Sequence, residues 1–338
     1  MSQPEGLHRL PLPGGEPLSV EVSAGRLRLL RGGQPLAQVA VGEEGRLPIF
    51  RLQELAAGES ETTIRAFCYW HFAHSPEHQR LAWRLDDAAE GALRSGLLIP
   101  AASGLLHAER SLFWQLPDPW LRGGQPPIYP PMMVMSANGR RHPLRAPKAS
   151  GEVYRRFDPR LGSWISLRTL DIELDLERFN RWQNSPRVLE FWQEGGSLEQ
   201  HREYLQKLAD DPHTLTLVGC FDDEPFAYFE AYWAKEDRIA PFYAVDDYDR
   251  GIHMLVGEEK HRGPHKVASW LSALVHYLFL DDPRTRKVVA EPRADNARMI
   301  AHMQGQGFYR EKEFDFPHKR AALMALEREW FFDKCELC

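Results

Sequence analysis

The chain has 338 residues, of which 43% are hydrophobic and 27% are charged, and its formal net charge is −6. The length favours two domains, the negative charge argues against a nucleic-acid-binding protein, and no apolar run approaches the roughly 20 residues that cross a bilayer. The first residues, MSQPEGLHRLPLPGGEPL, lack an apolar signal core. We therefore expect a cytoplasmic enzyme with no nucleic-acid partner and no membrane partner.

The first part of the chain is predicted to be β-rich. Predicted strands occupy residues 18–22, 27–30, 36–41, 64–72 and 105–116. The sequence Arg31-Gly32-Gly33-Gln34 is typical of a hairpin turn. Residues 76–98 are predicted to form one or two helices, because leucines and alanines recur on one stripe.

Prolines then interrupt regular structure between residues 117 and 150. Aromatic and apolar side chains such as Trp120 and Tyr129 lie among them, so we expect a packed connection and not a free tether. We place the domain boundary near Gly151. This gives a β-rich accessory domain over residues 1–150 and a second domain over residues 151–338.

The second domain alternates strands with helices. Strands are predicted at residues 164–170, 215–221, 226–233, 308–316 and 321–327. Helices are predicted at residues 174–182 and 185–193, and a third helix begins after Ser197, an N-cap residue with Gln200 three positions later. This mixture indicates the α+β class.

One stretch carries the clearest functional pattern. A short strand at residues 253–256 leads into a charged loop at residues 257–262, and Gly263-Pro264 opens a long amphipathic helix. Free N–H groups of a first helical turn and the helix dipole favour an anion, and basic residues surround that end. The pattern predicts a phosphate-binding loop. The alternative is a solvated loop between two ordinary elements.

A second strand at residues 287–291 and a helix from Asn296 to Gly307-Phe308 follow. This order resembles the acyl-CoA-binding half of the GNAT acetyltransferases, whose loop reads Gln/Arg-x-x-Gly-x-Gly/Ala. Here Arg262 holds the first place, but His265 and Val267 stand where small residues are usual. The resemblance implies a central, mostly antiparallel twisted sheet, acetyl-CoA as acyl donor and no metal. The implied cofactor contacts are Leu255, Val256, Gly257, Arg262, Gly263, Pro264, His265, Lys266 and Asn296.

Longer phrases narrow the resemblance. They are PFAYFEAYWAKED, YDRGIHML, HRGPHKV, EPRADNAR and EKEFDFPHKRAAL. Together they resemble the siderophore-biosynthesis acetyltransferases that acylate a side-chain hydroxylamine, of the aerobactin and rhizobactin type, over roughly residues 160–330. The implied product is a hydroxamate of a hydroxylated ornithine, lysine or diamine. A siderophore synthetase is a possible protein partner under this resemblance.

The resemblance also implies roles for individual residues. A hydroxylamine is largely neutral at cytoplasmic pH, so a carboxylate can act as base. Asp249 is our candidate for the general base, with a turn or cap role as the alternative. His253, four residues on, points to the same face of an extended strand. It could share the base role, hydrogen-bond the substrate, or be structural.

Three further side chains are assigned to the acceptor substrate. Arg187 could hold the amino-acid end, with a surface arginine as the alternative. Trp233 could line the site, and His318 could reach it from the closing hairpin or be a structural polar residue. Where many GNAT enzymes carry a tyrosine acid for the departing thiolate, this chain has Met303. Either His302 replaces that tyrosine or no protein acid acts.

Two other functions stay open. One is a GNAT acetyltransferase for an unhydroxylated amine such as an antibiotic, and the other is a non-catalytic acyl-CoA-binding subunit of a siderophore synthetase. Cys335 and Cys338 form a single C-x-x-C. A zinc site needs a second pair of ligands, so we expect a frayed tail there.

Overall fold

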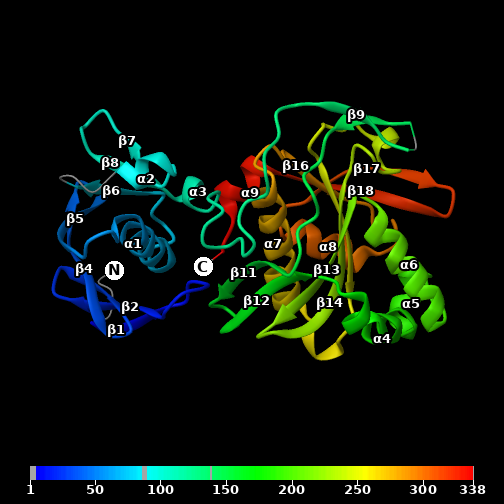
Figure 1. Cartoon of the computed structure of the whole chain (residues 1–338), viewed down its shortest axis with the longest axis horizontal. Helices are drawn as coiled ribbons and strands as arrows, with labels where there is room; N and C mark the ends of the chain where they lie inside the picture. The colour runs from blue at the N-terminus through cyan, green and yellow to red at the C-terminus, as the bar shows by residue number, and fades with distance from the viewer. Residues whose placement is uncertain (1–4, 86–89, 138, 338) are drawn as a thin grey trace. The chain divides into compact units, whose positions relative to one another are not determined.

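The structure is a computed structural model that describes residues 5–85, 90–137 and 139–337. Its residues group into two compact units that divide between Pro119 and Trp120. The proline-rich segment thus groups with the second unit, whereas the boundary that we predict from the sequence lies at Gly151. Figure 1 labels most of the helices and strands of both units.

The second unit is built on one eight-stranded sheet in the order β11-β12-β13-β14-β15-β16-β18-β17. Its strands are β11 Glu152–Asp158, β12 Ser163–Thr169, β13 Thr214–Phe221, β14 Glu224–Trp233, β15 Arg250–Val256, β16 Lys287–Ala290, β17 Tyr309–Phe316 and β18 Lys319–Glu327. Neighbouring strands are antiparallel except for the parallel pair β15–β16. The expected mixed fold with a mostly antiparallel sheet is confirmed.

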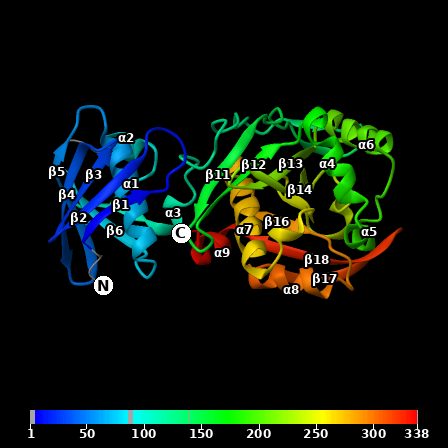
Figure 2. The same ribbon diagram turned by 90° about the horizontal axis from the view of Figure 1, so that it is seen from below.

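Helices cover both faces of this sheet, as Figure 2 shows. On one side are α4 Ile172–Gln183, α5 Pro186–Trp192 and α6 Leu198–Asp210. On the other are α7 Pro264–Asp281 and α8 Ala297–Gly305. Successive side chains of β14 point to opposite faces of the sheet, which explains the two helix layers. Tyr228 packs with α4–α6, while its neighbour Phe229 stacks on Trp270 of α7 at 5.3 Å. The capping box that we predict at Ser197 and Gln200 is present.

The parallel pair β15–β16 forms a splay. The two strands pair only at Arg250↔Val288 and Gly251↔Val289. Beyond Gly251, β15 continues to pair with β14 up to Val256, but it has no paired residue on β16. An opening between two strands exposes backbone N–H and C=O groups that a ligand can pair with. The splay is therefore a candidate place for the site of this unit.

The chain continues past the last strand as α9 Arg328–Lys334, which we did not predict from the sequence. Leu337 is buried, and its carbonyl accepts a hydrogen bond of 2.8 Å from Arg156. The expected frayed tail is therefore wrong up to Leu337. Cys335 has its thiol 3.8 Å from the Phe332 carbonyl, and Cys338 lies outside the described residues.

The first unit contains another eight-stranded sheet. Its strands are β1 Gly6–Leu10, β2 Leu18–Ser23, β3 Arg26–Arg31, β4 Gln34–Glu44, β5 Leu47–Leu55, β6 Arg80–Arg84, β7 Ile99–Pro100 and β8 Leu106–Glu109. Their order is β1-β2-β3-β4-β5-β6-β8-β7, and β5–β6 is the parallel pair. This order and the position of the parallel pair repeat those of the second unit. This repeat is not apparent in the amino-acid sequence.

Of three predictions for the first unit, one is wrong and two are wrong in part. Residues 86–89 of the predicted segment 76–98 lie outside the described residues. Residues 64–72 belong to the helix α1 Ser60–His74, which joins β5 to β6 as α7 joins β15 to β16. The segment 76–98 holds the strand β6 and the short helix α2 Glu90–Arg94, and the strand predicted at 105–116 stops at Glu109, where α3 Arg110–Phe113 begins. When a short apolar segment is buried on most sides, its hydrophobic residues show neither the helical nor the strand period. The sequence pattern then cannot distinguish a helix from a strand.

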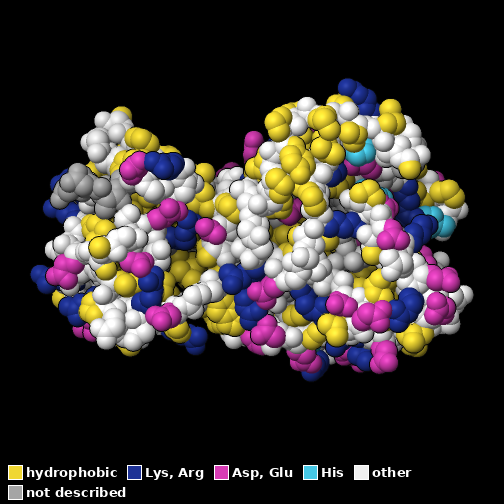
Figure 3. All heavy atoms as spheres, in the orientation of Figure 1, with side chains coloured by type: hydrophobic (Ala, Val, Ile, Leu, Met, Phe, Trp, Pro, Cys, Tyr) yellow, Lys and Arg dark blue, Asp and Glu magenta, His cyan; other side chains and the backbone are white. Residues whose placement is uncertain are grey.

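The surface of the second unit carries an apolar patch over the proline-rich segment, where β9 Met133–Met135 pairs with β10 Arg141–Pro143. Figure 3 shows hydrophobic side chains gathered there. Exposed members include Ile128, Met132, Met135 and Leu144. Within the described parts of the chain, no helix is long and apolar enough to cross a membrane.

Candidate active site

A half-buried histidine held between two buried carboxylates lies at the open part of the splay. His253 on β15 is bonded through Nδ1 to Glu230 on β14 at 2.7 Å, and through Nε2 to Glu291, just after β16, at 2.5 Å. Glu230 and His253 are cross-strand partners, so the sheet register itself places them side by side. The bond to Glu291 crosses from β15 to β16 where these strands no longer pair.

Tyrosine hydroxyls donate further hydrogen bonds to the carboxylates of Glu230 and Glu291. Tyr204 and Tyr228 donate to Glu230 at 2.5 and 2.8 Å, and Tyr232 donates to Glu291 at 2.8 Å. Both glutamates are at most 5% exposed. Buried charges persist only when they are paired and hydrogen-bonded, and this network satisfies both conditions.

The same contacts set the protonation of the site. Burial disfavours the His253 imidazolium, but the charge of Glu291 and the hydrogen bonds to both carboxylates outweigh it and raise the pKa of His253 to about 10. Burial also disfavours the Glu291 carboxylate, yet the imidazolium beside it lowers the pKa of Glu291 to about 2. At neutral pH the site therefore holds an imidazolium between two carboxylates, and both ring N–H groups act as donors.

Asp249 lies on the same face of the sheet as His253, but the structure does not bring the two together. Four residues of strand separate them by about 13 Å, and the Tyr232 ring covers Gly251 between them: a Cβ at Gly251 would lie 2.0 Å from that ring. Asp249 accepts hydrogen bonds from Tyr243 at 3.1 Å and from the Asp246 N–H at 3.0 Å.

The chemistry of Asp249 is nevertheless unusual. It is 1% exposed, and its Oδ1 has no hydrogen-bond partner among the residues the structure describes. Burial is the main cause that raises the pKa of Asp249 to about 6. The pKa thus fits a base, while the position at the closed end of the splay does not fit contact with a ligand in its open part.

The predicted phosphate-binding loop has the expected geometry. At the end of β15, the N–H groups of Gly257 and Glu258 both donate to the Phe226 carbonyl, at 2.9 and 3.1 Å, which is a bulge. Gly263 then adopts φ +121°, a conformation that side chains rarely take, and Pro264 occupies the first helical turn of α7. The N–H groups of that turn have no partner within the helix, so they can bind an anion.

Two arginines face this loop. Arg187 on α5 donates through Nη2 to the carbonyls of Val256 and Gly257, at 2.7 and 3.2 Å, and its buried Nε has no partner among the described residues. Burial, and then the nearby charge of Arg262, lower the pKa of Arg187. The structure therefore places Arg187 at the C-terminal end of β15, beside the loop predicted to bind phosphate, and not beside His253. Of the other basic residues, Lys260 pairs with Glu224.

Comparisons with known proteins bear on this geometry. Residues 171–316 match a family model described as an acetyltransferase (GNAT) domain. The chain is 45% identical over 235 residues to the N(6)-hydroxylysine O-acetyltransferase of Escherichia coli, covering 70% of this chain and 74% of that protein. It is also 45% identical over 256 residues, 75% of each chain, to a Schizosaccharomyces pombe protein named provisionally as a lysine N-acyltransferase. The chain belongs to the GNAT acetyltransferases.

One solved structure shares the fold of part of this chain. An uncharacterized protein of Bacillus halodurans, 30% identical, superposes with a TM-score of 0.53 over 55% of this chain and 95% of that one. The resemblance to the siderophore-biosynthesis acetyltransferases is thus confirmed, and the chain is an acyltransferase. The GNAT fold indicates that it binds acyl-CoA.

Several predicted residues of this GNAT enzyme have other surroundings. Trp233 lies on the opposite face of β14 from Glu230, with the guanidinium groups of Arg145 and Arg250 each 4.1 Å from its ring. It does not join the His253 group. Asn296 caps α8 by accepting a 3.2 Å hydrogen bond from Met299. Met303 is buried and cannot donate a proton.

His318, by contrast, reaches the edge of the site. It lies in the turn between β17 and β18, and its ring stacks on Phe316 at 5.5 Å. Its neighbour Lys319 donates to the backbone carbonyl of Glu291 at 2.7 Å. On the other side, Trp192 at the end of α5 approaches His253 edge-on, with ring centroids 6.3 Å apart. The acceptor side of the splay is therefore lined by α5 and the β17–β18 turn.

Glu230 and Glu291 were not among the site residues predicted from the sequence. A signal existed for each, because both are single carboxylates within or next to apolar strands, at PFAYFEAYW and VVAEP. A glutamate is almost never buried unless it is paired. Which histidine pairs with them depends on the register between strands, which the sequence does not display.

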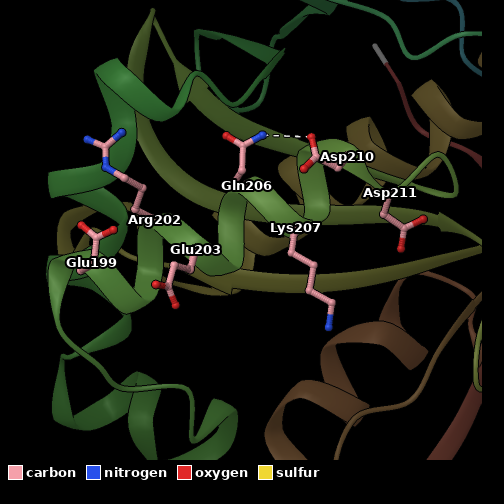
Figure 4. Close-up of a pocket in the computed structure, with 7 residues that line it drawn as sticks. All are labelled: Glu199, Arg202, Glu203, Gln206, Lys207, Asp210 and Asp211. Carbon is pink, nitrogen blue, oxygen red and sulfur yellow. Dashed lines mark hydrogen bonds between the residues drawn. The ribbon is translucent and has the colours of Figure 1, made fainter.

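Two other regions of the GNAT enzyme carry no comparable group. In the first unit, Glu59 of the loop between β5 and α1 pairs with Arg31 at 2.8 Å, so that loop is acidic where a phosphate loop is basic. The hollow drawn in Figure 4 is lined by seven side chains of α6 and its C-cap. None belongs to the His253 network. Among the residues described, we find no cluster of ligands suited to a metal ion.

Proposed function

We propose that this enzyme transfers an acetyl group from acetyl-CoA to the nitrogen of an N-hydroxylated side-chain amine, giving a hydroxamate for siderophore biosynthesis in the cytoplasm. The observation that carries this proposal is the 2.5 Å bond from His253 to Glu291 across the open splay. The names of relatives support it. One acts on N(6)-hydroxylysine, and another, from Ajellomyces capsulatus, is a hydroxyornithine transacylase 35% identical over 87% of this chain and 63% of that protein.

The protonation of the site suits a nucleophile that arrives neutral. Glu291 is too weak a base to deprotonate an alkylammonium, because its pKa is about 2. A hydroxylamine needs no such step. Once its nitrogen attacks the thioester carbonyl, the nitrogen becomes positively charged and its proton becomes acidic, so a carboxylate can accept it. During this attack His253 is still a cation and stabilises the negative charge that develops on the carbonyl oxygen.

His253 and Glu291 together also supply the acid for the departing thiolate, which Met303 cannot provide. In the proposed sequence the C–N bond forms, the proton of the nitrogen passes to Glu291, and the C–S bond breaks. His253 gives its proton to the departing thiolate, and the proton on Glu291 then returns to His253. One proton has moved from nitrogen to sulfur, and the charges of the pair are restored. Asp249, without contact to this pair, is assigned no step.

We assign the cofactor to the open splay and the loop after it. Its pyrophosphate would lie on the N–H groups of the first turn of α7, beside Arg187 and Arg262, and its pantetheine arm along Leu255 to Gly257. The Trp182 ring fills the side-chain direction of Gly257, where a Cβ would lie 2.1 Å from it, so this position must be glycine for α4 to pack against the end of β15. Arg187 is thus reassigned from the acceptor substrate to the cofactor.

The test is a steady-state assay of CoA release with Nε-hydroxylysine, Nδ-hydroxyornithine and the parent amino acids. We expect turnover with a hydroxylamine to exceed turnover with its parent amine at least tenfold. Ferric iron then distinguishes the product, because a hydroxamate forms a coloured complex whereas an O-acetyl ester does not. Faster turnover of plain lysine, or a product that fails to colour with iron, would refute the proposal.

A further inference from the structure

Basic side chains surround the ring of Phe316 at the end of β17. The Arg238 guanidinium lies 5.3 Å from the ring centroid, the Lys319 ammonium lies 5.6 Å from it, and the His318 ring stacks on it at 5.5 Å. Phe316 is itself buried. One fixed ring therefore gathers Arg238, His318 and Lys319, which we call the cation cluster.

The charges of Glu291, Asp237 and Glu194 act on the cation cluster, but among the described residues none of these carboxylates forms a hydrogen bond or ion pair with its side chains. Arg238 is exposed and has no hydrogen bond or ion pair within the described residues. Lys319 donates to the backbone carbonyl of Glu291, not to a carboxylate. Burial and then the charges of Arg238 and Lys319 lower the pKa of His318, as expected for groups that face one another. Such a concentration of positive charge favours a bound anion.

The cluster borders the reacting centre. Lys319 bonds the backbone of the residue whose carboxylate holds His253, so the two groups are joined through Glu291. The charge of Arg238 also acts on the phenol of Tyr204, which donates to Glu230. An anion on the cluster would thus belong to a molecule whose other end reaches His253 and Glu291.

We propose that the cation cluster binds the α-carboxylate of the acceptor, so that the enzyme selects N-hydroxylated α-amino acids over hydroxylated diamines. This inference rests on the proposed function above. Arg238 supplies a planar guanidinium that can hold a carboxylate through two hydrogen bonds, and Lys319 adds a point charge. Glu194, on the loop between α5 and α6, has an exposed carboxylate that acts on His318 and suits the α-ammonium group.

The test compares substrates that differ only in the carboxylate. CoA release is measured with Nε-hydroxylysine and N-hydroxycadaverine, and with Nδ-hydroxyornithine and N-hydroxyputrescine. A hydrogen-bonded charge contributes roughly 1.5–3 kcal/mol, which is about a 10- to 100-fold preference in kcat/KM for the amino acid. Arg238→Gln should remove most of that preference by raising KM for the amino acid, while kcat/KM for the diamine changes less than about twofold.

Controls separate the possible failures. Arg320→Gln changes the exposed arginine next to Lys319, which pairs with Glu313 and Asp315, and it should leave the preference intact. If the wild-type enzyme acylates neither type of substrate, the proposed function fails. If it acylates both types equally, or if Arg238→Gln lowers both values alike, the proposed function stands and the carboxylate site is refuted.

Discussion

Glu291→Gln is the substitution that tests the site most directly. Glutamine keeps the size of the side chain and can still accept from Tyr232, but it can neither carry the charge that faces His253 nor accept the substrate proton. Loss of a general acid–base group typically lowers kcat by about 10²- to 10⁴-fold, which corresponds to roughly 3–5.5 kcal/mol. We therefore expect a loss of that size in kcat, with the Kd for acetyl-CoA changed less than about threefold.

The structure also predicts a change in protonation. The Glu291 charge is the largest favourable influence on the His253 imidazolium, so the pKa of His253 should fall from about 10 in the variant. Glu230 remains as the partner of Nδ1 at 2.7 Å. Breaking a buried ion pair costs about 3–5 kcal/mol, and we expect the lower end because one carboxylate is retained. NMR titration of the His253 ring and urea unfolding measure the two effects.

Two control variants separate the effect of the Glu291 charge from the effect of the surrounding side-chain contacts. Tyr232→Phe removes the 2.8 Å hydrogen bond to Glu291 but keeps the carboxylate, so kcat should fall less than about tenfold. Glu313→Gln changes an exposed carboxylate on β17 that pairs with Arg310 and should have no effect. A folded Glu291→Gln enzyme with near wild-type kcat, or with a His253 pKa still near 10, would refute this account of the site.

Three further predictions follow from single features. Asp249→Asn should keep kcat within about tenfold of wild type. The pKa of Asp249 rises from 3.8 to about 6 on folding, so the native state binds the extra proton and wild-type stability falls by up to about 3 kcal/mol as pH rises through that interval. The variant should therefore gain stability relative to wild type between pH 4 and pH 8 in urea unfolding; a constant difference, or a loss of kcat beyond 10²-fold, would contradict this. Arg262→Glu should weaken acetyl-CoA binding at least tenfold in calorimetry while Arg310→Glu does not, and unchanged affinity would displace the cofactor from the loop. His74→Ala and His78→Ala in the first unit should leave turnover within about twofold, and a collapse of kcat in folded protein would show that this unit contributes to catalysis.

Local sequence signals were sufficient to predict the structure where the conformation of a short segment depends only on its own residues. Ser197 with Gln200 fixed the start of α6, and Gly263-Pro264 fixed the start of α7, because capping and backbone conformation depend on neighbouring residues. The collinear phrases around Tyr248, His261 and Glu291 were enough for the family. They also led to the loop that we propose for the cofactor, since strand, basic loop and helix follow one another directly in the chain.

The composition of the catalytic group depended on the tertiary structure. Asp249 and His253 are close in sequence and share a face, yet strand geometry holds them about 13 Å apart. Glu230 and Glu291 stand 23 and 38 residues from His253, but sheet register and the splay of β15 from β16 place all three in contact. The first unit shows the same limit: α1 is buried on most sides, so its sequence loses the helical period that exposure to water would impose, and only the packing around it reveals a helix.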